Sequence, residues 1–292
     1  MEPLYLIFLL VAIACVLGFA YIMLISPRMA RASMKKFLTH ATYFAHRGLH
    51  DKDNPENSLP AFALAVEKGF GIELDVQISS DGIPVLLHDD LLKRGTGEEG
   101  YVHDYTLEEL QAMPLFGRED LSIPTLASVL ELVDGKSPLI VEIKASRPEW
   151  RETLRGAMKL LEAYEGPYCI ESFNPLVLRE LRRCCPGVLR GLLCECYGRS
   201  FKKEGKKMPF AFFAGECFWL NAIARPDFIA YNCQHADFFP FRLMTWLFPE
   251  CTFITWTTRK PEDEKTSRSF EAYIFEDYLP AAPQKEDVND EN

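Results

Sequence analysis

The chain has 292 residues, 48 % of them apolar, and is long enough to form one large domain with a sizeable core. Its net charge of -10, with no basic stripe, argues against a nucleic-acid partner. The nine cysteines include no Cys-x-x-Cys pair, so we expect reduced, mostly buried thiols rather than a disulfide framework. Because no histidines lie nearby, a zinc site at Cys194 and Cys196 is not expected.

The N-terminal segment predicts a membrane helix. Residues 4–25 carry no charge and reach the length of about 20 residues that spans a bilayer. A signal peptide would begin with positive charge and have a shorter apolar stretch. Basic residues instead follow the run: Arg28, Arg31, Lys35 and Lys36. We therefore expect a membrane anchor over 1–27, a basic linker over 28–41, and a single-pass protein of the cell membrane whose catalytic domain is cytoplasmic.

After the linker, short apolar or β-branched runs alternate with helix-length segments. The expected strands are Thr42–Ala45, Gly71–Ile78, Pro138–Ile143, Tyr168–Glu171, Val188–Leu193, Asp227–Tyr231, Thr252–Trp256 and Ala272–Phe275, with Ile83–Leu87 returning as an extended segment after a turn. The clearest helices are Ser58–Lys68, Pro124–Val133, Glu149–Tyr164 and Pro175–Cys184. This alternation predicts an α/β fold with a parallel sheet, and its count and length favour a TIM (β/α)8 barrel over 42–280. An open doubly wound sheet is the alternative, but no Gly-rich phosphate loop follows the first strand.

Three further segments have distinct compositions. Residues 89–122 lack strand periodicity and are expected to form an insertion on the functional face of the barrel. The aromatic-rich stretches Pro209–Trp219 and Phe238–Phe248 either cover the barrel or face a membrane, and core packing is the favoured reading. Residues 281–292 are acidic and polar and are predicted to be a disordered tail.

Two acids on the second strand are the first candidates for chemistry. Glu73 and Asp75 lie two residues apart, so both side chains leave the same face of the strand. Side-by-side carboxylates on a buried strand repel each other and resist desolvation. A bound cation resolves both problems, while a pair of salt-bridged or edge-exposed acids is the alternative.

The strand Pro138–Ile143 repeats this arrangement. Glu142 and Lys144 share one face of the strand, and the opposite face carries the apolar residues Leu139, Val141 and Ile143. A simple ion pair is possible, but in a barrel both strands deliver these groups to the C-terminal mouth, where active sites form. Three oxygen ligands, from Glu73, Asp75 and Glu142, favour Mg²⁺ or Ca²⁺ over zinc.

Two histidines occupy matching positions at strand ends. His46 ends the first strand and is followed by Arg47, and His88 precedes Asp89. A lone histidine at such a place is more often structural. Two of them flanking a carboxylate-bearing strand indicate a general acid and a general base. Arg47 and Lys144 are suited to balance the charge of a phosphate.

These motifs together resemble the glycerophosphodiester phosphodiesterase family. The motifs occur in the order His46-Arg47-Gly48, Pro55-Glu56-Asn57-Ser58, Glu73-Leu74-Asp75-Val76, His88-Asp89 and Glu142-Ile143-Lys144. The resemblance extends from about Tyr43 to Pro280. It implies a TIM barrel that releases sn-glycerol 3-phosphate and an alcohol from glycerophosphodiesters.

The resemblance also implies a role for each matching residue. Glu73, Asp75 and Glu142 match the metal ligands, and His46 and His88 match the acid/base pair. Arg47, Lys144 and Trp256 match positions that bind phosphate or substrate, and Glu56 matches an acid at the edge of the metal site. The segment Ile274–Pro280 departs from the family's usual Gly-rich ending, which leaves the leaving group unspecified.

Two other functions stay open. The anchor suggests a lysophospholipase D-like activity on membrane lysolipids. A catalytically silent, membrane-bound binding protein on the same barrel is the second alternative, although it would need neither His46 nor His88. His50 lies close to the first-strand loop and either lines the pocket or is a packing residue.

Overall fold

The computed structural model describes residues 2–280, so the predicted acidic tail lies outside the described residues. Eight parallel strands close into a barrel, because β1 pairs with both β2 and β9. The strands are β1 (Tyr43–Ala45), β2 (Gly71–Ile78), β4 (Leu139–Ile143), β5 (Tyr168–Ser172), β6 (Arg190–Cys194), β7 (Phe228–Asn232), β8 (Thr252–Thr258) and β9 (Phe270–Phe275). The predicted barrel is confirmed, and each predicted strand agrees with an observed one to within two residues at either end.

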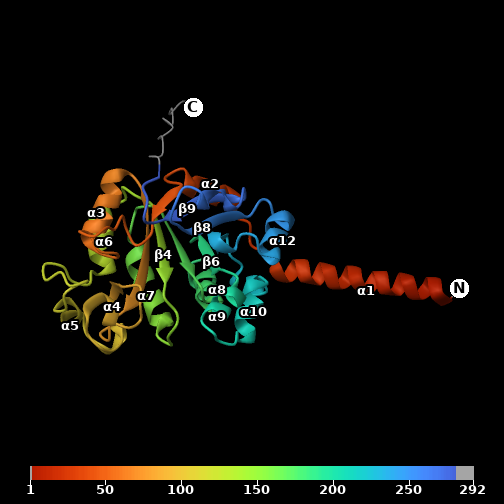
Figure 1. The fold of residues 1–292 in the computed structure, drawn as a ribbon, viewed down its shortest axis with the longest axis horizontal. Helices are drawn as coiled ribbons and strands as arrows, with labels where there is room; N and C mark the ends of the chain where they lie inside the picture. The colour runs from red at the N-terminus through yellow and green to blue at the C-terminus, as the bar shows by residue number, and fades with distance from the viewer. Residues whose placement is uncertain (1, 281–292) are drawn as a thin grey trace, which may run out of the picture.

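Helices surround the barrel and connect most of the strands (Figure 1). They are α3 (Leu59–Lys68), α6 (Leu126–Val133), α7 (Trp150–Leu161), α8 (Pro175–Cys184), α9 (Tyr197–Lys203), α10 (Phe210–Glu216), α11 (Asn221–Ala224) and α12 (Phe239–Leu247). The expectation of a helix between every pair of later strands is wrong for β8 and β9. Within the described chain, only the short 3-10 helix η3 (Asp263–Thr266) lies between them.

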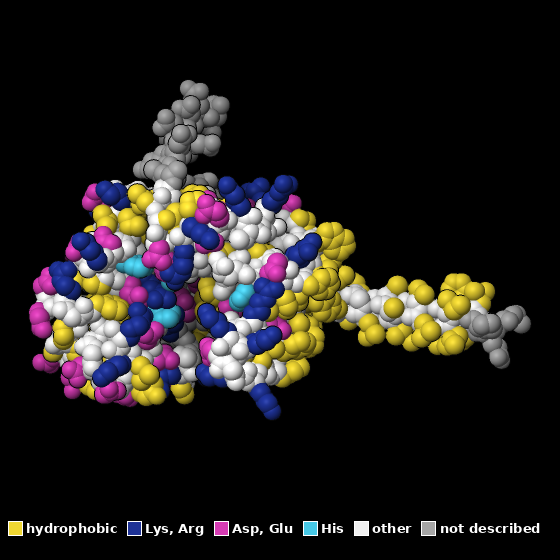
Figure 2. Space-filling model, in the orientation of Figure 1, with side chains coloured by type: hydrophobic (Ala, Val, Ile, Leu, Met, Phe, Trp, Pro, Cys, Tyr) yellow, Lys and Arg dark blue, Asp and Glu magenta, His cyan; other side chains and the backbone are white. Residues whose placement is uncertain are grey.

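The N-terminal helix α1 (Glu2–Ile25) projects away from the barrel (Figure 1). Its residues Leu4–Ile25 are long and apolar enough to cross a membrane, and their side chains are almost all exposed. Figure 2 shows apolar side chains along this helix and on the adjoining part of the barrel surface. The exception is the last turn, where Ile25 is buried in the domain.

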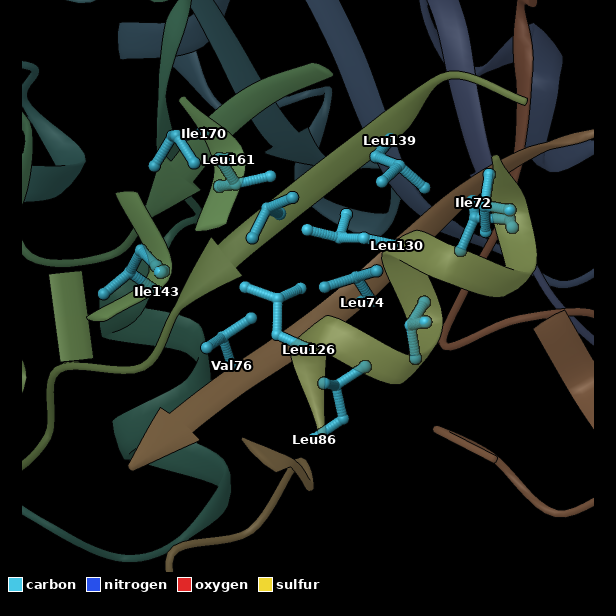
Figure 3. Packing of buried hydrophobic residues seen from close by; sticks show 14 of the residues in the cluster. Ile72, Leu74, Val76, Leu86, Leu126, Leu130, Leu139, Ile143, Leu161 and Ile170 are labelled. Atoms are coloured by element: carbon cyan, nitrogen blue, oxygen red, sulfur yellow. The ribbon is translucent and has the colours of Figure 1, made fainter. Parts of the chain in front are cut away.

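The main core lies between the sheet and its outer helices. Alternate residues of β2, Ile72, Leu74 and Val76, point outward and pack against Leu126 and Leu130 of α6 (Figure 3). The period-2 alternation therefore directs the acids of β2 to the barrel interior.

The segment expected to be a linker contains a helix that closes one end of the barrel. Met34 and Phe37 of α2 (Arg31–Leu38) are buried with Phe44 and Ile140 in the barrel interior. These apolar side chains seal the N-terminal end of the strands. The opposite end remains available for a site.

The insertion after the second strand has a small core of its own. Strand β3 (Pro84–Leu86) returns antiparallel to β2. It leads into α4 (Lys93–Thr96), η1 (Val102–Asp104) and α5 (Leu107–Gln111). Apolar residues hold these turns together, among them Leu87, Leu92 and Leu110.

The aromatic-rich stretches are divided between core and surface, so the favoured reading of core packing holds only in part. Phe218, Phe241 and Phe248 are buried. In contrast, Phe210 and Trp246 are about three-quarters exposed, at 72 % and 75 %. All nine cysteines lie in the described chain and are free thiols, five of them buried, as expected.

Candidate active site

A row of acids crosses three neighbouring strands inside the barrel. Asp75 of β2 pairs in register with Glu142 of β4, and Glu142 pairs with Glu171 of β5. Glu73 lies one pleat before Asp75 on the same face. All four side chains are at most 8 % exposed. The alternation of each apolar strand thus places one or two carboxylates in the interior.

Three of these acids converge. Carboxylate oxygens of Glu73, Asp75 and Glu142 lie within 4.8 Å of one another. Burial, together with the charges of Asp75 and Glu142, raises the pKa of Glu73 well above its usual range. Burial likewise raises the pKa of Glu142 to about 7. Burial would also raise the pKa of Asp75, but Lys144 and His88 outweigh it and hold this pKa low.

The acids outnumber the cations that face them. Lys144 Nζ lies 2.8 Å from Asp75 Oδ1 and 3.0 Å from Glu142 Oε1. The ion pair between Glu142 and Lys144, which the sequence left open, is therefore present. Arg47 Nε lies 3.3 Å from Asp75 Oδ2.

Four buried carboxylates therefore face two cations. The Oε2 atom of Glu171 is buried without a hydrogen-bond partner in the described chain. This all-oxygen, negatively charged donor set fits a hard divalent cation such as Mg²⁺ or Ca²⁺.

The loop between β1 and α3 positions the residues around these acids. Arg47 and Asn57 both adopt left-handed φ angles, 56° and 52°. This conformation points the Arg47 amide at Glu73 Oε2, 3.0 Å away, and lets Asn57 Nδ2 donate to Asp75 Oδ2 at 2.8 Å. Ser58 then caps α3 by accepting a hydrogen bond from the amide of Ala61.

Glu56 lies beside the acid cluster rather than in it. Its Oε1 accepts from Arg47 Nη1 at 2.9 Å and from Arg94 Nη2 at 2.7 Å. Burial opposes ionisation of Glu56, but Arg94 and Arg47 outweigh it and lower its pKa. Glu56 therefore lies at the edge of the acid cluster, and a role beside a metal stays a prediction.

His46 is held by an acid on the last strand of the barrel. Its Nδ1 contacts Glu276 Oε2, and its Nε2 lies 4.0 Å from Glu73 Oε2. Glu276 also pairs with Arg259 and lies 3.7 Å from His50 Nε2. Burial lowers the pKa of His46, although Glu276 partly opposes this effect.

His88 has a parallel arrangement on the other side of the site. Its Nδ1 lies 2.6 Å from Asp89 Oδ1. Burial lowers the pKa of His88, which favours the neutral imidazole. In both histidines a carboxylate contacts Nδ1, which leaves Nε2 directed at other partners.

A cavity of about 810 Å³ opens beside the acids. His88, Glu142 and Lys144 line its polar end. Its walls come from several connections at the mouth of the barrel: Leu91 and Tyr101 of the insertion, Phe173 after β5, Tyr197 of α9, and Phe212 of α10. The mouth of the barrel is therefore both charged and apolar.

Trp256 does not line this cavity. Its ring meets Phe173 edge-on, with centroids 5.5 Å apart, and packs partly against the barrel interior. Its indole nitrogen is buried without a hydrogen-bond partner in the described chain. The Phe173 side chain therefore lies between Trp256 and the cavity.

Three residues around the site were not among the predicted site residues: Glu171, Glu276 and Asn57. Glu171 had a visible signal, because it is an acid near the end of an apolar strand, as Glu142 is. Glu276 meets His46 only because the barrel closes between β9 and β1, and 230 residues separate the two. No local pattern could reveal that contact.

Comparisons with known proteins agree with this geometry. The profile of the glycerophosphoryl diester phosphodiesterase family matches residues 46–188, which contain the acid cluster, both histidines and Lys144. A glycerophosphodiester phosphodiesterase of Caldanaerobacter subterraneus is 41 % identical over 162 residues, or 52 % of this chain. Over residues 46–188, the chain is therefore similar to this family. Human glycerophosphodiester phosphodiesterase 1, another relative, is 27 % identical over 256 residues, covering 80 % of this chain and 76 % of the human protein.

Family members of known structure share the fold. The glycerophosphodiester phosphodiesterase of Thermotoga maritima superposes with a TM-score of 0.64 at 25 % identity, covering 82 % of this chain and 95 % of that one. An Oleispira antarctica phosphodiesterase, solved with sn-glycerol-3-phosphate, gives a TM-score of 0.65 at 21 % identity, covering 81 % and 93 %. Among the relatives, the aligned segments span only 66 % of the Caldanaerobacter protein and 46 % of a Bacillus altitudinis one, which is less than two thirds of each.

Proposed function

We propose that this protein hydrolyses glycerophosphodiesters to sn-glycerol 3-phosphate and an alcohol, with a divalent cation held by Glu73, Asp75 and Glu142. The observation that carries the proposal is the convergence of these three buried acids, within 4.8 Å, at the mouth of the barrel. Similarity to this family supports the reaction class. When bound, Mg²⁺ or Ca²⁺ would neutralise phosphate charge and lower the pKa of a coordinated hydroxyl.

The chain supplies the remaining groups. Arg47 and Lys144 offer positive charge beside the acids, and Arg47 can bind a phosphate through its planar fork. His46 and His88 each have Nδ1 against a carboxylate, so Nε2 can accept a proton or, once protonated, donate one. Glu276 and Asp89 would fix the imidazole orientation and favour its charged form as it arises.

The test is turnover of glycerophosphocholine with Mg²⁺ or Ca²⁺, followed as glycerol 3-phosphate released. We expect turnover to stop with a chelator and to resume when the metal is restored. Both His46→Ala and His88→Ala should lose about 10²–10⁴-fold in kcat. Activity that survives chelation would remove the metal role. No turnover by folded, metal-loaded protein would favour a binding protein instead.

We further propose that α1 is a membrane anchor over 1–27 and that the barrel domain, 42–280 with its insertion at 89–122, lies in the cytoplasm. The burial of Ile25 in the domain core supports retention of α1, since removal of a signal sequence would expose this core. Arg28 and Arg31 follow the helix, as the positive-inside rule requires for this orientation. Digestion of the barrel by protease added to intact cells would overturn the orientation.

A second candidate function is hydrolysis of membrane lysolipids. The cavity favours it, because its volume of about 810 Å³ reaches from Lys144 to the apolar Phe212 and Leu220. That apolar region could accept a hydrocarbon chain while the phosphate lies at the acids. Comparing kcat/KM for lysophosphatidylcholine and glycerophosphocholine on the full chain tests it. A preference for the lysolipid that disappears in Phe212→Ser would support this function.

A further inference from the structure

Two short helices beside α1 expose aromatic side chains. On α10, Phe210 is 72 % exposed and Phe213 is 38 % exposed. On α12, Phe239 and Trp246 are 71 % and 75 % exposed, and their spacing of seven residues puts them on one face of the helix. We call these four side chains the aromatic face. An isolated exposed aromatic is ordinary, but four exposed aromatics on two helices that pack on the same core cluster mark an interaction surface.

Continuous apolar packing joins the aromatic face to the base of α1. The Trp219 ring lies 6.2 Å from Phe210 and 5.7 Å from Phe213, between centroids. Trp219 packs in turn against the cluster that contains Ile25 and is flanked by Tyr21 of α1. The buried side of α12 belongs to the same cluster. Figure 2 shows the resulting apolar surface running from α1 onto the barrel.

The junction between α1 and the barrel is fixed by hydrogen bonds. The buried Asn221 donates from Nδ2 to the carbonyl of Ile25 at 2.6 Å, and the Arg28 amide donates to the carbonyl of Pro226 at 2.8 Å. The apolar run Leu4–Ile25 has 22 residues. At about 1.5 Å per residue it matches a hydrocarbon core of about 30 Å with little to spare. No spacer therefore separates a membrane-inserted α1 from the barrel surface.

The end of α9 and the loop that leads from it into α10 are basic, and together they are called the lysine loop. Lys202, Lys203, Lys206 and Lys207 are all exposed, and the only acid among them is Glu204, which pairs with Lys206 at 2.8 Å. This concentration of positive charge is unusual in a chain of net charge -10. Lysines beside exposed aromatics are the combination that binds an anionic lipid surface.

We propose that the aromatic face and this lysine loop dock on the surface of an anionic phospholipid bilayer, so that the barrel rests on the membrane in a fixed orientation. The proposal rests on the proposed anchoring by α1 and goes beyond it, because anchoring by the helix alone does not require the barrel surface to touch the lipid. Aromatic side chains favour the membrane–water interface, and the rigid junction holds these four close to it. A second copy of the chain is the competing occupant.

Docking would also place the cavity close to the lipid. Ala211, Phe212 and Gly215 of α10 line the cavity, while Phe210 and Phe213 of the same helix belong to the aromatic face. One helix therefore forms both a wall of the cavity and part of the docking surface. An amphiphilic substrate in the bilayer would reach the site across this wall.

The test reconstitutes the full chain in nanodiscs of equimolar phosphatidylcholine and phosphatidylglycerol, with plain or brominated acyl chains. The fluorescence of Trp246 is obtained as the difference between the native chain and Trp246→Phe. We expect the brominated acyl chains to quench more than half of the Trp246 fluorescence. The matched control is Ile83→Trp in the Trp246→Phe background. Ile83 is partly exposed and lies two residues after Asp81, which accepts a hydrogen bond from the first residue of α5. Helix α5 lies on the far side of the barrel from α1 (Figure 1), so the fluorescence of a tryptophan at position 83 should persist.

The lysine loop is tested by replacing all four lysines with Gln. We expect quenching of Trp246 to fall in the anionic discs and to match that of the native chain in pure phosphatidylcholine. An unquenched Trp246 in the native chain would overturn the proposal, as would two chains per disc with Trp246 shielded by a second copy. Carbonate extraction tests α1 separately, and turnover of glycerophosphocholine tests the enzyme, so failure of either is distinguishable from failure of docking.

Discussion

At the scale of single residues, neighbouring carboxylates in the barrel mouth carry opposite pKa shifts. Burial raises the pKa of Glu142 to about 7 and raises the pKa of Glu73 well above its usual range. The pKa of Asp75 is lowered, because Lys144 and His88 outweigh its burial. Without a metal, the site therefore favours the ionised form of Asp75 and the protonated forms of Glu73 and Glu142. A cation that binds this site must displace protons.

Metal binding is therefore expected to release about one proton or more at pH 7. The release should decrease as pH rises above 7, because Glu142 is then already ionised. Metal affinity should fall as pH drops below 7, because protons compete for the same oxygens. Titration calorimetry with Mg²⁺ or Ca²⁺, in buffers of different ionisation enthalpy, measures the proton count. Binding heats that do not depend on the buffer would contradict the expectation.

Glu171 and Glu142 make a matched pair for testing which acids are ligands. Burial and Glu142 raise the pKa of Glu171 well above its usual range, so the neutral Glu171→Gln resembles the metal-free form. We expect this variant to fold normally and to lose about tenfold in metal affinity through the lost surrounding charge. Glu142→Gln removes a proposed ligand and should abolish binding. Equal losses in the two variants, measured by calorimetry, would move Glu171 into the ligand set.

At the scale of elements, the loop between β1 and α3 depends on its glycine. Gly48 has a φ of +83°, and a Cβ there would lie 2.9 Å from the backbone carbon of Ala61. Gly69, after α3, has a similar φ of +75° but has open space around it. These two positions separate the effect of backbone strain from that of close packing.

We expect Gly69→Ala to cost about 1 kcal/mol of unfolding free energy, from the left-handed conformation alone. Gly48→Ala should cost roughly 1–3 kcal/mol more, as overpacking adds to the same strain. It should also reduce kcat/KM, because the shifted loop carries Arg47 and Asn57. Urea unfolding and glycerophosphocholine turnover measure the two effects. Equal stability of the two variants would mean that α3 moves freely away from the loop.

Local sequence patterns predicted the helices and strands well, but they did not predict the contacts between these elements. Strand β2 has the predicted bounds because its alternation is regular, and Ser58 caps α3 because its side chain acts on the adjacent turn. The partner of His46 depends instead on barrel closure, which brings Glu276 of the last strand beside the first. The contact between Asn57 and Asp75 was not predicted, because it depends on a left-handed φ angle of Asn57 that the amino-acid sequence does not show.

At the scale of the whole molecule, α1 and the barrel form one folded unit rather than an anchor on a flexible tether. Tyr21 and Ile25 belong to the packing of the domain, and Asn221 hydrogen-bonds the final carbonyl of the helix. The segment expected to be a linker contains α2, which closes the barrel through Met34 and Phe37. Composition predicted the apolar helix and its basic flank, but not that both ends of this region are built into the domain.

This unity predicts that a residue at the end of α1 stabilises the barrel. Ile25→Ala in the full chain should cost about 2–5 kcal/mol, because the side chain is 1 % exposed and its removal leaves a cavity. The matched control is Ile22→Ala, since Ile22 is 36 % exposed and is not part of the buried cluster that contains Ile25. Thermal unfolding of both variants in the same detergent gives the comparison. If the helix were removed as a signal sequence, neither variant would change the melting temperature of the mature protein. A loss confined to Ile25→Ala therefore supports a retained helix, and equal effects of the two substitutions would contradict it.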